Sequence, residues 1–141
     1  MFSLVAGLAI LVGCSTSPKM DEGQAAAGGQ LMELYACYMQ YTNQNRRGPG
    51  SIEELQPLLN SAGVDSSNVL LSPRDGSEMV VLWGVTPDVT SGEPVVIGYE
   101  ANAHEGQRMV MTSMGVWAMS DDDFYTASFP SGHQAPARSG N

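Results

Sequence analysis

Three consecutive aspartates, Asp121, Asp122 and Asp123, are the densest group of metal-ligating side chains in the sequence. Calcium prefers carboxylate oxygens but needs six to eight ligands, which a loop with spaced acidic residues usually supplies. Here Ser120 precedes the acidic run and Phe124 follows it, so the same residues suit the first turn of a helix. A serine cap and early carboxylates both stabilise a helix N-terminus. We therefore predict a helix start and keep the three aspartates as weak calcium candidates.

The other reactive side chains lack the neighbours that catalysis or metal binding requires. His104 lies in a predicted turn and His133 near the C-terminal end, without the three or four ligands of a zinc site. Cys37 lies at the flank of a predicted helix, and no histidine follows nearby to act as its base. No serine lies in a Gly-x-Ser-x-Gly context. We predict a protein that is not an enzyme and uses no metal or cofactor. The alternative is a small periplasmic enzyme or metal-binding lipoprotein whose site no motif reveals.

Cys14 lies in a context that favours a different chemistry. It follows an uncharged apolar run at residues 2–13 and precedes the polar residues Ser-Thr-Ser-Pro. This run is about half of the roughly 20 residues that a membrane-spanning helix needs. Its length fits the apolar part of a signal peptide. The alternative is that residues 2–13 form a buried strand or helix of the folded domain.

The residues Leu11-Val12-Gly13-Cys14 resemble the lipobox of bacterial lipoproteins. This resemblance implies a signal peptide at 1–13, cleavage before Cys14, and fatty acylation of its thiol by palmitate-type chains. The protein would then be lipid-anchored in the cell envelope, on the outer membrane or the periplasmic face of the inner membrane. Each buried acyl methylene contributes about 0.8 kcal/mol, so several chains would hold a small domain durably.

The charge balance argues against other modes of attachment. Fifteen acidic residues face six basic ones, which gives a net charge of −9, and the basic residues form no cluster. Binding to nucleic acid or to anionic lipid headgroups depends on clustered cations. We therefore expect no nucleic-acid partner, and we expect the membrane contact to come from the lipid on Cys14.

Helical periodicity begins in the sequence after a polar stretch. Residues 14–29 read as the lipidated cysteine and a flexible tether, and residues 30–45 as one amphipathic helix with Tyr35 and Tyr38 on its apolar face. Arg46 and Arg47 are expected in its last turn. A second helix is expected from Ser51, with a capping box formed by Ser51 and Glu54.

Strand patterns follow these helices. Alternating and β-branched residues predict strands at 78–84, 93–101, 107–112 and 116–119, joined by short turns. Met109 and Met111 share one face, expected in the core, and Trp83 and Trp117 are expected to fill the interface between helix and sheet. Glu93 and Glu100 are expected on the surface. We predict an α+β domain at 30–128, with a helix packed on an antiparallel meander, and a disordered tail at 129–141.

This layout resembles the globular part of type IV pilins and of the pseudopilins of type II secretion. The step Gly-Pro-Gly-Ser-Ile-Glu-Glu-Leu after the helix resembles secreted pseudopilin-like proteins. The segment from His104 to Trp117 resembles a hairpin of pilin-like proteins abundant in planctomycetes. The resemblance implies a binding or scaffolding domain with an envelope or secretion-system partner. A pilin's long apolar helix stem is missing, so filament assembly does not carry over.

Overall fold

The computed structural model describes residues 21–138, and its first element is the long helix α1, Glu22–Asn45. The Asp21 side chain caps this helix by accepting a hydrogen bond from the Gln24 backbone N–H at 2.6 Å. Three alanines, the best helix formers, follow at positions 25–27. The helix therefore begins at Glu22 and not at residue 30, so the prediction of a flexible tether was wrong for the described residues 21–29. The predicted signal peptide and Cys14 lie outside the described residues.

The junction between α1 and α2, Ile52–Ser61, differs from the predicted caps. Arg46 adopts a left-handed conformation with φ 61° and ends α1, so neither Arg46 nor Arg47 lies in its last turn. Ser51 makes no side-chain capping bond. Instead, the Glu54 carboxylate accepts from the Gly50 N–H at 2.6 Å and pairs with Arg47 at 3.0 Å. One glutamate thus holds the turn between the two helices.

The sheet is an antiparallel meander of four strands in the order β1-β2-β3-β4. Its strands are β1 (Val80–Val81), β2 (Val96–Tyr99), β3 (Gln107–Thr112) and β4 (Gly115–Ser120), and the short helix α3, Asp121–Thr126, follows directly. The predicted α+β class is confirmed. The first predicted strand is reduced to two residues, because the chain turns at Trp83 and Gly84. Within residues 21–138, no helix is both long and apolar enough to cross a bilayer.

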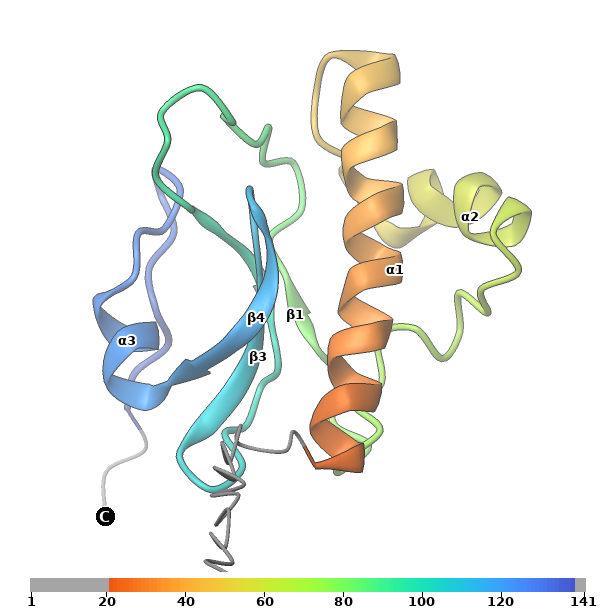
Figure 1. Ribbon diagram of the computed structural model, residues 1–141. Coiled ribbons are helices and arrows are strands. Elements are labelled where there is room, and N and C mark those ends of the chain that lie inside the picture. The colour runs from red at the N-terminus through yellow and green to blue at the C-terminus, as the bar shows by residue number, and fades with distance from the viewer. Residues whose placement is uncertain (1–20, 139–141) are drawn as a thin grey trace, which may run out of the picture.

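Helices cover both faces of this sheet, as Figure 1 shows. On one face, α1 and α2 enclose a core that includes Met109 and Met111, as predicted. On the other face, Val110 packs with α3 and Phe124. Strand β3 is consequently buried on both faces, although the sequence predicted a helix on only one.

The chain after α3 contributes to the second core. Phe129 and Ala135 pack against Tyr99 and Phe124, and the Phe129 and Phe124 rings meet edge to face with centroids 5.7 Å apart. The prediction of a disordered tail from residue 129 was therefore wrong for the described residues up to 138. The apolar residues of this segment are few, so the sequence pattern gave a weak signal.

The aromatic residues divide between the interior and the surface. Tyr38 is fully buried and stacks on Trp83, whereas Tyr35 is half-buried against the same core. Trp117 is 37 % exposed, so its predicted place between helix and sheet was wrong. The turn between β3 and β4 has two residues, which pairs Trp117 with Val110 and directs it to the α3 face. A turn one residue longer, as predicted, would have exchanged the faces.

Candidate functional site

The three aspartates lie at the start of α3 as the helix-start interpretation predicted. The Ser120 hydroxyl accepts from the Asp123 backbone N–H at 3.2 Å, which confirms the serine cap. Asp121 lies 3.5 Å from Arg108, and Asp122 lies 3.4 Å from Arg138. Two of the carboxylates therefore face different arginines. Among residues 21–138, no three histidine, cysteine, aspartate or glutamate side chains are grouped to hold a metal ion.

The two histidines occupy different environments. His133 is exposed, whereas His104 is half-buried with its Nε2 atom 3.2 Å from Asp75 Oδ2. Hydrogen bonds from Ser77, and then from Asn102, hold the pKa of Asp75 well below its usual range. Asp75 therefore stays ionised beside His104, and the pair links the 73–77 loop to the turn before β3.

Cys37 is more buried than predicted, with only 4 % of its surface exposed. Burial, followed by the nearby charge of Glu33, raises the pKa of its thiol. A raised pKa keeps the thiol protonated at neutral pH, and the thiolate is the reactive form. The side chain accordingly serves as a small apolar residue of the core.

Glu100 is the main charged residue whose location was predicted wrongly from the sequence. It was expected on the surface, but only 1 % of it is exposed. Its carboxylate accepts from the Met109 backbone N–H at 2.8 Å and from the Ser72 hydroxyl at 3.3 Å, and it lies 3.2 Å from Arg74 Nε. The Arg74 side chain is itself buried. This ion pair holds the 72–74 loop against β2 and β3.

Arg108 forms a second buried cationic centre on the opposite face of β3. Its guanidinium lies 4.2 Å from the centroid of the Phe124 ring and donates to the backbone carbonyls of Glu100 and Ala101 at 3.3 Å. These contacts place it between the sheet and α3. Glu100 and Arg108 pair with different partners, Arg74 and Asp121. The signal in the sequence is that each of these charged residues directly adjoins the apolar residues of a strand.

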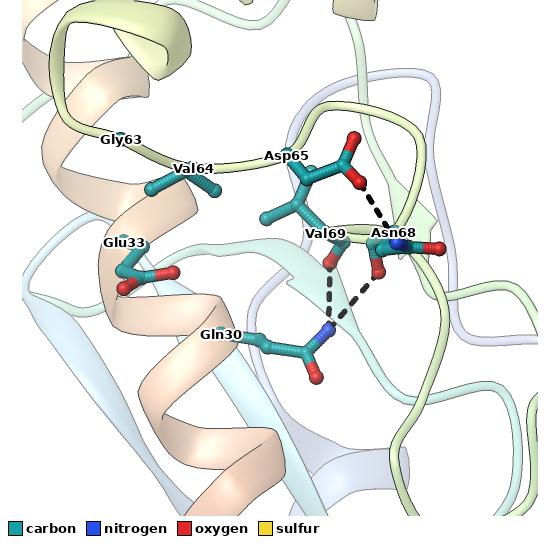
Figure 2. Close-up of a pocket in the computed structure, with 7 residues that line it drawn as sticks. All are labelled: Gln30, Glu33, Gly63, Val64, Asp65, Asn68 and Val69. Carbon is teal, nitrogen blue, oxygen red and sulfur yellow. Dashed lines mark hydrogen bonds between the residues drawn. The ribbon is translucent and has the colours of Figure 1, made fainter.

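A small cavity of about 210 Å³ lies between α1 and the 63–69 loop (Figure 2). In Figure 2 the Gln30 side chain points from α1 to the loop, where its amide nitrogen donates to the carbonyls of Asn68 and Val69 at 3.3 and 3.1 Å. Asp65 in turn accepts from the Asn68 amide at 2.8 Å. The bonds of Gln30 therefore fasten the loop to the helix, and the bond between Asp65 and Asn68 holds the loop itself.

A larger groove of about 360 Å³ lies where β4 meets the end of α3. Trp117 and Met119 of β4 line it together with Pro94 and Ala127. Glu93 and Asp123 are its acidic residues, and no lysine or arginine lines it. This groove combines the exposed tryptophan with an acidic border, and it is the candidate binding surface of the described residues.

Comparisons of the chain with protein-family models, with curated proteins and with solved structures give no match.

Proposed function

We propose that this protein is a lipid-anchored protein of the bacterial cell envelope whose domain binds another protein and catalyses no reaction. The binding role is supported by a contrast between buried charged side chains and one exposed tryptophan. Glu100, Arg74 and Arg108 are buried and hold structural segments together, whereas the large apolar side chain of Trp117 is presented in an open groove. Exposed tryptophans in grooves are typical anchors for protein partners.

The anchoring role is supported by the lipobox-like sequence and by the position of α1. Seven peptide steps join Cys14 to the capping residue Asp21, and they span at most about 25 Å when fully extended. A lipid on Cys14 would thus hold the N-terminal end of α1 close to the bilayer. The opposite end of α1 and the turn between α1 and α2 would face away from it.

The resemblance to pilins and pseudopilins adds to the proposed class of partner. A long helix on an antiparallel meander is the layout that this resemblance implies, and the described domain has this layout. By analogy of fold, the partner is an envelope or secretion-system protein, and the domain acts as its scaffold at the membrane.

The anchor is tested by replacing the thiol. We expect the wild-type protein to sediment with membranes and to accumulate as a longer precursor when globomycin inhibits the lipoprotein signal peptidase. The Cys14→Ser variant lacks the acceptor atom, so it should leave the membrane fraction. A variant that stays membrane-bound, together with unchanged processing in globomycin, would refute lipid anchoring.

The binding role is tested by photo-crosslinking in living cells. A benzoylphenylalanine residue is placed at one exposed position of each surface, for example Ala25 on α1, Asn60 on α2 and Trp117 on β4. We expect a protein adduct of defined mass at one or more of these positions, and its loss in the Cys14→Ser background, where the domain is no longer at the membrane. Absence of adducts at every position would refute a protein-binding role.

A further inference from the structure

Strand β4 is an open edge of the sheet. It has six residues and keeps a continuous register along its whole length, and within residues 21–138 it pairs only with β3. The opposite edge, β1, has only two residues. Natural sheets usually protect long edges with lysines, prolines or bulges. Strand β4, Gly-Val-Trp-Ala-Met-Ser, has none of these.

The pairing of β3 determines which backbone N–H and C=O groups of β4 point outward from the sheet. Met109 directs its carbonyl to β2, where it accepts from the Glu100 N–H at 3.0 Å, so Val110 directs its backbone groups to β4. Its partner Trp117 therefore bonds inward to β3. Because backbone direction alternates along a strand, Val116 and Ala118 direct their N–H and C=O groups outward. These groups are available to an added strand.

Apolar side chains flank this edge on both faces of the sheet. On the α3 face, Trp117 lines the groove. On the α1 face, Met32, Tyr35 and Met39 share one flank of the helix by their helical spacing. That flank is opposite to the one that faces α2, where Glu33 and Cys37 line a cavity. In Figure 1, α1 and α3 lie on either side of β4, which is the strand nearest the viewer.

The acidic charge beside β4 indicates which kind of partner segment can pair with this edge. Glu93 and Asp123 line the groove, and the whole chain carries a net charge of −9. A second copy of the chain would bring the same acidic groove to the interface, and like charges oppose such pairing. An extended segment with lysine or arginine side chains is electrostatically complementary.

We propose that β4 accepts an extended basic segment of a partner protein as a fifth strand of the sheet. The outward groups of Val116 and Ala118 bond to the partner backbone. Basic partner side chains at alternate positions lie over the groove, where they contact Trp117 and meet Glu93 and Asp123, and the intervening side chains face α1. Strand addition to a sheet edge is a recurring mode of peptide recognition. This inference rests on the proposed binding role and specifies its surface.

The test uses full-length lipidated protein in detergent micelles and a labelled nine-residue peptide of alternating lysine and valine. We expect saturable binding by fluorescence anisotropy, which weakens at high salt, and slower hydrogen exchange at residues 115–120. A peptide of alternating glutamate and valine should bind at least about tenfold more weakly. N-methylation of every second peptide amide should abolish binding, because it removes the donors that pair with β4.

Variants of the protein test the same surface. Ala118→Pro removes an outward N–H without breaking the pairing to β3, and it should weaken binding about tenfold or more. Ala118→Ser keeps the N–H and should bind as wild type. Trp117→Ala should also weaken binding. If the proline variant does not fold, the N-methylated peptide still supplies the backbone test.

Several outcomes would overturn this inference: no binding of the lysine peptide, equal binding of the acidic peptide, or protection outside residues 115–120. Concentration-dependent protection of these residues without peptide would identify a second copy as the occupant and would also refute it. In those cases, photo-crosslinks at Ala25 or Asn60 without any at Trp117 would leave the binding role intact. No crosslinks anywhere would refute the binding role itself.

Discussion

At the scale of single residues, the buried pair of Arg74 and Glu100 explains how a polar loop can close a small core. Each charge loses its hydration when buried, and the loss is offset only if partners satisfy the charge. Glu100 has three such contacts, from Met109, Ser72 and Arg74. These contacts span three segments of the chain, so the pair fixes their arrangement.

Replacing Glu100 by alanine leaves the Arg74 guanidinium buried and uncompensated. We expect Glu100→Ala to lower the free energy of unfolding by about 3–5 kcal/mol, measured by urea denaturation. Glu33→Ala, at an exposed position of α1, should change it by less than about 0.5 kcal/mol. The double variant Arg74→Met/Glu100→Met should recover much of the loss. A cost below about 1 kcal/mol for Glu100→Ala would contradict the structural role of the pair.

At the scale of secondary-structure elements, the turn between α1 and α2 depends on one carboxylate. Glu54 binds Arg47 and the Gly50 N–H, and these bonds, with Arg47 the stronger influence, lower the pKa of Glu54 to about 2. Gly48 lies in the same turn, where an added Cβ would collide with the Val85 carbonyl. The turn is thus held by the ion pair of Arg47 and Glu54, and its Gly48 backbone packs closely against the Val85 carbonyl.

The ion pair of Arg47 and Glu54 predicts that the stability of the protein depends on pH. Because the folded pKa of Glu54 lies below the ordinary value of 4.5, its stabilising effect is present above pH 4.5 and is lost as pH falls towards 2. An NMR titration of the Glu54 carboxyl should show the low pKa, and Arg47→Met should raise it. An unshifted pKa of Glu54 in the wild-type protein, or no change of this pKa in Arg47→Met, would contradict the proposed role of the ion pair.

Several elements could be predicted from sequence because local signals agreed. The consecutive apolar residues Met109, Val110 and Met111 predicted β3, and the serine before the acidic run predicted the start of α3. The capping box at Ser51 was wrong because Glu54 reaches one residue further back, to Gly50, and binds Arg47. The face of Trp117 was wrong because it depends on a single residue in the β3–β4 turn.

At the scale of the whole molecule, the sheet has two cores, and the C-terminal segment helps to close the second. The packing of this segment could not be predicted from the sequence, because Phe129 is its one large apolar side chain. Its contact with Tyr99 joins β2 to the end of the chain, which are distant in sequence, and no local pattern encodes such a contact. For the same reason the groove around Trp117 could not be predicted.

Removing this segment tests the two-core arrangement. Deletion of residues 129–141 exposes Phe124 and Tyr99, so we expect a clear decrease in thermal midpoint, as well as binding of a hydrophobic dye. Deletion of only the last three residues, 139–141, is the matched control and should change little. Equal stability of both truncated proteins would show that the second face does not need the segment.

The proposed function depends on where the molecule is held, and mass spectrometry of the intact protein from native membranes measures this directly. We expect a mature chain that begins at Cys14 and carries the added mass of its acyl chains. An unmodified thiol at residue 14, in a chain that retains residues 1–13, would contradict the envelope location and the scaffold role proposed with it.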